Sequence, residues 1–146
     1  MINFNLNKKD FSQPKTDCRI AFFGVKNWEK EIIEREISNL DTFGVGIFEE
    51  EVQDNLELAA KYDVISPFIY STFDEKVLEK LPNLKMIATR STGMDHIDIN
   101  WCKKNKITVA NVPVYGSNTV AEYAFALLLA VTRKIVVAHQ SVEDGE

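Results

Sequence analysis

The amino-acid sequence predicts an α/β protein in which a five-stranded parallel sheet carries helices on both faces. Two observations lead to this fold class. Short runs rich in β-branched and aromatic residues alternate with segments in which apolar residues recur at helical spacing. Strands that alternate with helices in this way form βαβ units, and the strands of such units pair in parallel.

The elements follow one another from residue 19 onward. Strands are predicted over residues 19–24, 44–48, 64–70, 86–90 and 107–112. The first helix is predicted from the helical spacing of Trp28, Ile32, Ile33, Ile37 and Leu40. Three more helices are predicted over residues 55–62, 74–81 and 97–105. Right-handed crossovers between these elements give a doubly wound, flavodoxin-like sheet.

Local signals mark where some elements begin and end. Pro67 cannot donate to a neighbouring strand, so the third strand is expected to end or bulge there. Asp74 is expected to cap the third helix, and Pro82 to stop it. Pro113 and Gly116 indicate a non-helical connection after the fifth strand.

The last predicted helix differs from the others in being apolar on nearly every face between residues 123 and 131. Thr119 and Glu122 fit a capping box, so the helix is expected to begin at Thr119 and to run to about Ala138. A helix of this kind is expected to be buried all round. The five-strand domain could cover one side of it, and a second domain or another subunit the rest.

Composition and charge exclude several classes of protein. The net charge of -5 argues against a nucleic-acid-binding face, and the acidic run 49–51 is expected to be a solvated loop. Residues 1–17 form a polar tail without a signal peptide, and no apolar run is long enough to cross a membrane. Cys18 and Cys102 form no disulfide framework and no metal motif, so we expect reduced thiols in a cytoplasmic protein without a metal site.

The segment most informative about function is RSTGMDHID, residues 90–98. It follows the fourth strand, at the sheet edge where ligands of open parallel sheets bind. It also runs into a predicted helix, whose first N–H groups suit a small anion. Gly93 lets a ligand approach the main chain. The alternative is a plain strand–helix turn capped by Asp95 or Ser91.

Three motifs in order, RSTGMDHID at 90–98, NVPVY at 111–115 and NTVAE at 118–122, resemble those of the D-isomer-specific 2-hydroxyacid dehydrogenases. The resemblance extends over about residues 19–145, and the D-lactate branch is the nearest. It implies that residues 18–112 form a substrate domain. Residues 113–146 would then form a hinge and the first long helix of a truncated NAD-binding Rossmann domain.

The resemblance also implies roles for particular residues. The main-chain amides of Ser91, Thr92 and Gly93 would hold the substrate carboxylate, and Thr92 would also face the nicotinamide of the cofactor NAD. Tyr115 would contact the substrate, unless it only closes the linker between domains. Phe68 would line the substrate site, unless it is an ordinary core phenylalanine.

Other parts of the family pattern are expected beyond Glu146. These are the glycine-rich loop G-x-G-x-x-G and the catalytic arginine, glutamate and histidine. The chain would therefore hold no catalytic residue, and the 146 residues alone are expected to be inactive. His96 is interpreted as a structural residue at a helix start, and His139 as a solvated side chain. The helix from Thr119 resembles the dimer-forming helix of the family, although it could instead be buried against its own missing domain.

The sequence thus predicts part of an enzyme that reversibly reduces a small 2-keto acid to a D-2-hydroxy acid with NADH, and that forms a homodimer. The rival hypothesis is a non-catalytic dimerising or binding module of the same fold, such as a corepressor. The loop 24–28 lacks the features of a flavin-binding or phospho-relay protein. The sequence leaves open which 2-hydroxy acid is the substrate and whether NAD or NADP is the cofactor.

Overall fold

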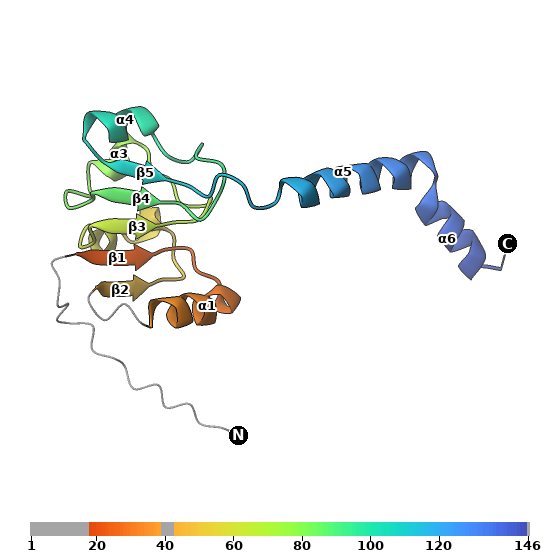
Figure 1. The fold of residues 1–146 in the computed structure, drawn as a ribbon, viewed down its shortest axis with the longest axis horizontal. Coiled ribbons are helices and arrows are strands. Elements are labelled where there is room, and N and C mark those ends of the chain that lie inside the picture. Colours follow the sequence, from red (N-terminus) through yellow and green to blue (C-terminus); the bar gives the residue numbers. More distant parts are fainter. Residues whose placement is uncertain (1–17, 39–42, 146) are drawn as a thin grey trace, which may run out of the picture. The chain divides into compact units, whose positions relative to one another are not determined.

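The computed structural model describes residues 18–38 and 43–145. The chain divides into two compact units, of which the first ends at Pro113 and the second begins at Val114. The first unit contains a sheet of five parallel strands in the order β2-β1-β3-β4-β5, which confirms the predicted fold class (Figure 1). The strands are β1 (Arg19–Phe22), β2 (Gly44–Ile47), β3 (Val64–Ser66), β4 (Met86–Ala88) and β5 (Thr108–Ala110).

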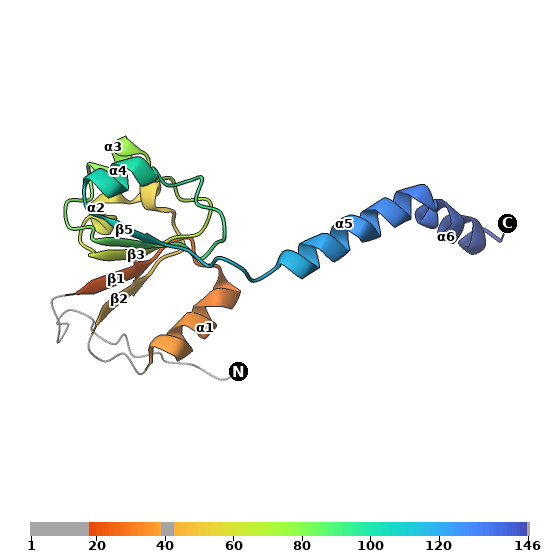
Figure 2. The same ribbon diagram turned by 45° about the horizontal axis from the view of Figure 1, so that its top comes forward.

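The helices of the first unit cover both faces of the sheet. Figure 2 shows α1 (Asn27–Ile37) on one face and α2 (Leu56–Ala59), α3 (Glu75–Leu78) and α4 (Ile99–Lys104) on the other. A short 3-10 helix, η1 (Val52–Asp54), precedes α2. The first crossover runs outward from β1 to β2, and the later ones run the opposite way to β5. Because each crossover is right-handed, this reversal places α1 opposite the other helices.

The core of the first unit joins the sheet to the elements packed on it. Its largest fully buried hydrophobic side chains are Phe23, Phe73, Ile65, Leu78 and Ile87. Burying a side chain of this size stabilises the fold by roughly 1.5–3 kcal/mol. No residue of α1 is buried, and the side chain of Trp28 is 71% exposed. Leu40, which the periodicity assigned to the same helix, lies outside the described residues.

Side-chain caps mark the starts of three helices, which are all shorter than predicted. Asn55, Asp74 and Asp98 each precede a helix and accept a hydrogen bond from the third main-chain N–H that follows. Capping by Asp74 is therefore confirmed, but the helix after it ends with Glu79 as its C-cap, before Pro82. β3 ends at Ser66, next to Pro67, as predicted. The fourth helix begins two residues later than predicted because Asp98 lies outside it as its cap.

The second unit contains two helices, α5 (Ser117–Thr132) and α6 (Ile135–Glu143). The predicted capping box is wrong, because Gly116 is the N-cap and Thr119 and Glu122 lie inside the helix. The predicted single helix to Ala138 is also wrong. Lys134 adopts a left-handed conformation (φ 50°), which the helical repeat cannot contain, so the chain begins a new helix there.

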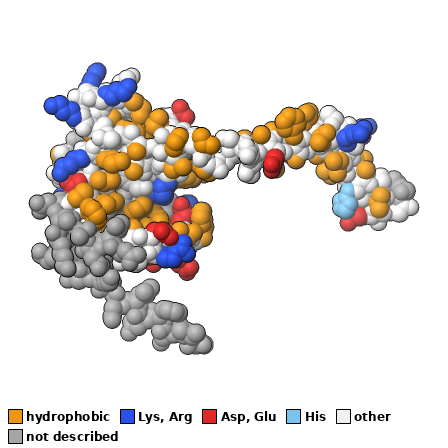
Figure 3. All heavy atoms as spheres, in the orientation of Figure 1, with side chains coloured by type: hydrophobic (Ala, Val, Ile, Leu, Met, Phe, Trp, Pro, Cys, Tyr) orange, Lys and Arg blue, Asp and Glu red, His pale blue; other side chains and the backbone are white. Residues whose placement is uncertain are grey.

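The second unit exposes much of its apolar surface. No residue of α5 or α6 is buried by the described part of the chain, so the expected burial of this helix on all sides is not found there. Figure 3 shows apolar side chains along this unit. They include Tyr123, Phe125, Leu127, Leu128, Leu129 and Val131. Among the described residues, no helix has both the length and the apolarity needed to cross a membrane.

Candidate functional site

The carboxyl edge of the sheet has one position at which the winding direction reverses. It lies between β1 and β3, which are neighbours in the sheet and lead to crossovers on opposite faces. Ligands of open α/β sheets bind beside such a reversal, outside the carboxyl ends of the strands. The segments that follow β1, β3 and β4 meet at this edge, and they include the loop at Gly93.

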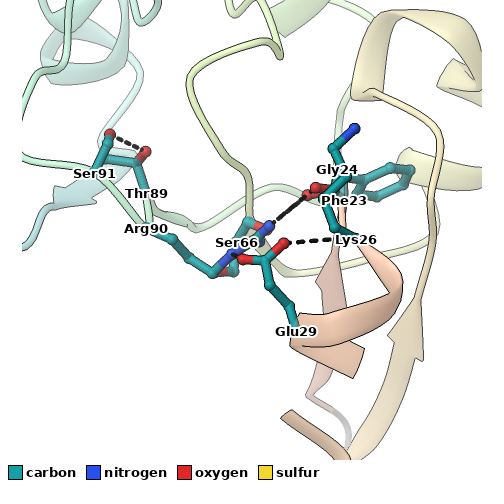
Figure 4. Close-up of polar contacts among 8 residues, drawn as sticks. All are labelled: Phe23, Gly24, Lys26, Glu29, Ser66, Thr89, Arg90 and Ser91. Carbon is teal, nitrogen blue, oxygen red and sulfur yellow. Dashed lines mark hydrogen bonds and ion pairs between the residues drawn. The ribbon is translucent and has the colours of Figure 1, made fainter. Parts of the chain in front are cut away.

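The side chain of Arg90 lies at this reversal and reaches the ends of β1 and β3 (Figure 4). Its Nη1 atom donates to the carbonyl of Ser66 at 2.5 Å, and its Nη2 atom donates to the carbonyls of Phe23 at 3.0 Å and Gly24 at 3.4 Å. Its Nε atom lies 3.7 Å from a carboxylate oxygen of Glu29, and the side chain is only 18% exposed. The guanidinium therefore joins the ends of three strands and is not free to bind a substrate.

Two carboxylates accompany this buried cation. Burial lowers the pKa of Arg90, while Glu29 and Glu51 act in the opposite direction. Glu29 also accepts a hydrogen bond from the main-chain N–H of Lys26 at 2.9 Å, which ties the start of α1 to the ion pair with Arg90. Glu51 is half-buried and accepts a hydrogen bond from the hydroxyl of Ser71 at 2.6 Å. The expectation of a solvated acidic loop is therefore wrong for Glu51, whereas Glu49 and Glu50 are exposed.

The loop that follows Arg90 is not the start of a helix. α4 begins at Ile99, and Asp98 is its N-cap. The prediction that the N–H groups of a helix start lie at Gly93 is therefore wrong. Neither Asp95 nor Ser91 caps the helix, so the alternative of a turn capped by one of them is wrong as well. The side chain of Ser91 is buried, while Thr92 and Gly93 are exposed.

Hydrogen bonds hold this loop through its carbonyl groups. The carbonyl of Ser91 accepts from the main-chain N–H of Val112 at 3.0 Å, and that of Thr92 accepts from Nδ2 of Asn111 at 2.8 Å. The hydroxyl of Ser91 donates to the carbonyl of Gly93 at 2.8 Å. Among residues 18–38 and 43–145, no group accepts a hydrogen bond from the main-chain N–H of Thr92, Gly93 or Met94. Bare amides in sequence are suited to a small anion.

The loop has open space beside Gly93. A Cβ atom added at Gly93 would come no closer to another residue than 3.4 Å, the distance to a carboxylate oxygen of Asp95. The hydroxyl of Thr92 donates to the carbonyl of Val112 at 2.9 Å. The loop is therefore open at Gly93 and fixed on the side of the segment that follows β5.

The two histidines lie in different surroundings. His96 precedes α4, and its Nε2 atom lies 3.2 Å from the hydroxyl of Thr89. Burial lowers the pKa of His96, and Asp95 opposes that shift. His139 is exposed and lies 3.6 Å from a carboxylate oxygen of Glu143, one turn later in α6.

The aromatic residues assigned by sequence lie in different units. Phe68 follows β3 and packs edge-on against Tyr70, with ring centroids 5.8 Å apart. It is half-buried and does not belong to the buried core, which argues against the alternative of an ordinary core phenylalanine. Tyr115 belongs to the second unit, and its side chain is 70% exposed. Ser91, Thr92 and Gly93 thus lie together in one loop of the first unit, whereas Tyr115 belongs to the second unit.

Sequence reasoning missed two residues of this site. Arg90 and Asn111 stand at the start of two of the motifs, but no role was predicted for either. An arginine directly after an apolar strand was the available signal for Arg90, since such a side chain starts beside buried carbonyls. Asn111 gave no comparable signal. No cluster of three potential metal ligands occurs in the described part of the chain.

Comparison with known proteins places this architecture in a family. Residues 20–145 match the family model of the catalytic domain of D-isomer specific 2-hydroxyacid dehydrogenases. A glyoxylate reductase of Thermococcus litoralis is 41% identical over 91 residues, which cover 62% of this chain and 28% of that protein. An aromatic 2-oxoacid reductase of Clostridium sporogenes is 42% identical over 88 residues, which cover 59% of this chain and 27% of the relative.

A solved structure agrees with these sequence relatives. The D-lactate dehydrogenase of Aquifex aeolicus, complexed with NAD and lactic acid, matches with a TM-score of 0.77 and 31% identity. The match covers 86% of this chain and 37% of that one. The chain therefore spans less than two fifths of the length of each of these three proteins. From its sheet order, its loop at Gly93 and the match over residues 20–145, the chain belongs to the D-isomer-specific 2-hydroxyacid dehydrogenase family.

Proposed function

We propose that this chain supplies the substrate-carboxylate site of an NAD-dependent enzyme that interconverts 2-keto acids and D-2-hydroxy acids. One observation carries the proposal: the exposed loop after β4 presents main-chain N–H groups at Thr92 and Gly93 that have no acceptor among the described residues. The compounds named for the three relatives are glyoxylate, aromatic 2-oxoacids and lactic acid. All of them carry a carboxylate next to the carbon that is reduced or oxidised.

In this proposal the chain binds and orients the acid. The amides of Thr92 and Gly93 hold the carboxylate, and this fixes the position of the neighbouring keto carbon. NADH, when bound, would supply the hydride for reduction of the keto acid, and NAD would accept it in the reverse direction. The hydroxyl of Thr92 is occupied by Val112, which leaves its methyl group for contact with a nicotinamide ring. The six glycines of the sequence contain no G-x-G-x-x-G spacing, so these residues would hold the nicotinamide end of the cofactor and not its phosphates.

The substrate that we propose is pyruvate, with D-lactate as the product. The similarity to a D-lactate dehydrogenase supports this choice, and in this proposal Tyr115, whose side chain is exposed, would contact the small acid. Phe68 would limit the space beside the carbon chain. The relatives named for other acids make glyoxylate and phenylpyruvate the appropriate competitors in the test.

We also propose that the second unit begins the NAD-binding domain and that α5 joins two subunits. The exposed apolar side chains of α5 support an apolar partner, and a helix of this composition is expected to be covered. The free thiols of Cys18 and Cys102 support a reducing compartment such as the cytoplasm. The solution mass of the natural polypeptide tests the dimer, and Leu128→Glu is expected to yield monomers. A monomeric wild type would contradict this part of the proposal.

The test of the proposed activity uses the longest natural polypeptide that contains this chain. NADH oxidation is measured with pyruvate, glyoxylate and phenylpyruvate, and oxamate serves as a non-reacting carboxylate. Gly93→Ala is expected to keep the fold, because a Cβ atom there meets only ordinary contacts, but to weaken oxamate binding by crowding the amides. Gly116→Ala, where nothing lies within 4 Å of the added atom, is the matched control. The proposal fails if none of the three acids is reduced and oxamate does not bind.

A further inference from the structure

Three consecutive peptide units of the loop share one arrangement. The carbonyls of Ser91, Thr92 and Gly93 each accept a hydrogen bond from the protein. A peptide unit is planar and trans, so its N–H points away from its own carbonyl. The N–H groups of the same three units belong to Thr92, Gly93 and Met94, which have no acceptor among the described residues. In each peptide unit, therefore, the carbonyl accepts a hydrogen bond, and the N–H has no acceptor among the described residues.

The donors that hold these units come from two places. Val112 and Asn111 belong to the segment after β5, 21 and 19 residues beyond the groups that they bind. The third donor is the hydroxyl of Ser91, within the loop itself. The bond from Val112 is main chain to main chain, and the carbonyl of Thr92 depends on the side chain of Asn111.

The hydroxyl of Ser91 is itself part of a directed chain. A hydroxyl has one hydrogen, and that of Ser91 goes to the carbonyl of Gly93. The hydroxyl of Thr89, 2.7 Å away, must then donate to Ser91 (Figure 4). Thr89 has no second hydrogen for His96, so it accepts from the Nε2–H of that ring at 3.2 Å. The chain runs from His96 through Thr89 and Ser91 to Gly93, and each bond polarises the next.

We propose that Asn111 is a positioning residue for the substrate carboxylate. By holding the carbonyl of Thr92, it fixes the peptide unit whose other end is the bare N–H of Gly93. The hydroxyls of Ser91 and Thr89 fix the following unit in the same way. Donors that are already aimed need no reorganisation when the anion arrives, so their orientation adds to affinity. The inference rests on the proposed function, because it takes the loop as the carboxylate site.

The test compares two asparagines in the longest natural polypeptide. Asn111→Ala removes the bond to Thr92, and Asn83→Ala removes a bond of the same length, 2.8 Å, to the carbonyl of Ala60. Asn83 lies between α3 and β4, at the opposite edge of the sheet. Each asparagine uses its side-chain amide to bind a distant main-chain carbonyl. The two variants therefore remove the same type of hydrogen bond from different places in the fold.

Asn111→Ala is expected to raise the Kd of oxamate and the KM for the 2-keto acid about tenfold, since a hydrogen bond contributes about that factor. The KM for NADH and kcat are expected to stay close to those of the wild type, because an interaction made equally in ground and transition state affects KM alone. Asn83→Ala is expected to leave the Kd of oxamate unchanged. Both variants are expected to lower Tm by similar, small amounts.

Ser91→Ala provides a second measurement in case Asn111→Ala does not fold. It removes the donor to Gly93 and is also expected to raise the Kd of oxamate. The inference is overturned if the wild type binds oxamate and Asn111→Ala and Ser91→Ala both bind it as tightly as the wild type does. It is also overturned if Asn83→Ala weakens binding as much as Asn111→Ala does. A wild type that binds no oxamate and reduces no 2-keto acid overturns the proposed function instead.

Discussion

The Nη2 atom of Arg90 donates a hydrogen bond to the carbonyl of Phe23, 67 residues earlier in the chain, at 3.0 Å. The same guanidinium binds the carbonyl of Ser66, so one side chain joins the ends of β1 and β3 where the sheet reverses its winding. An arginine suits this position because its planar group presents several N–H donors at fixed angles.

Arg90→Ala is expected to lower the free energy of unfolding by about 2–4 kcal/mol, because Glu29 loses its partner at a place with little exposure to water. Arg90→Lys is expected to recover only part of this loss, since an ammonium lacks the planar, fixed set of donors with which the guanidinium binds the two carbonyls. Urea unfolding followed by circular dichroism measures the change. Arg35→Ala is the matched control. Its guanidinium is exposed and pairs with Glu36, so a loss below about 0.5 kcal/mol is expected. Equal losses for Arg35→Ala and Arg90→Ala would contradict the role of Arg90.

Asp63→Asn is expected to lower stability at neutral pH by about 1–3 kcal/mol, because the carboxylate accepts from the main-chain N–H of Arg19 at 3.0 Å and pairs with Lys85 at 2.9 Å. Burial raises the pKa of Asp63, but the bonds to Arg19 and Lys85 outweigh it, so the pKa lies below its ordinary value of 3.8. The stability gained from a lowered pKa is present above the ordinary value and is lost as the pH falls through the folded-state value.

Denaturant unfolding of wild type and Asp63→Asn at a series of pH values checks this prediction. The difference between them is expected to be constant above about pH 5 and to shrink below pH 3.8. Glu34→Gln, on the exposed surface of α1, provides the control and is expected to change the stability little at neutral pH. A difference that grows on acidification would refute the assigned direction of the pKa.

Gly46→Ala is expected to destabilise the fold by about 1–3 kcal/mol, the usual cost of overpacking. An added Cβ atom would overlap the hydroxyl of Tyr62 and approach the ring of Phe48 to 2.6 Å. Thermal unfolding measures the loss. The double variant Gly46→Ala with Tyr62→Phe, which removes the hydroxyl, is expected to be more stable than the two separate losses imply. Simple additivity would show that Tyr62 is not the obstacle.

The pH dependence of stability is expected to include a contribution from His96. Burial lowers its pKa below the ordinary 6.5, so the unfolded chain binds the proton first as the pH falls. Stability is therefore expected to be full above pH 6.5 and to decrease below it, and His96→Gln is expected to flatten this part of the profile. The chain has two histidines, so NMR titration of their ring protons can follow His96 directly. A His96 resonance that titrates above pH 6.5 would contradict the prediction.

Much of the fold could be predicted because its signals are local. Apolar residues at two different spacings distinguished strands from helices, and Asp74 identified a helix start from a bond that spans three residues. Pro67 ended β3 because it has no N–H to donate. The position of the loop at Gly93 after the fourth strand, at the carboxyl edge of the sheet, was also predicted from sequence, whereas one of the reasons for expecting an anion there, a helix N-terminus, was wrong.

Predictions that ignored distant or competing interactions failed. Thr119 and Glu122 have the spacing of a capping box, yet the helix already begins at Ser117, and spacing alone cannot say which of several possible starts is used. The left-handed conformation of Lys134, which separates α5 from α6, could not be predicted, because Lys134 and its neighbours are all residue types that favour or tolerate a helix.

By itself, the sequence determined the order of strands and helices along the chain and the loop in which an anion site should be sought. Only the tertiary structure decided that Arg90 joins the ends of β1 and β3, and that Asn111 holds the carbonyl of Thr92. The physical reason is the range of the interactions. Periodicity, caps and proline act within a few residues, whereas these hydrogen bonds join groups 19 to 67 residues apart, which come together only when the sheet has formed.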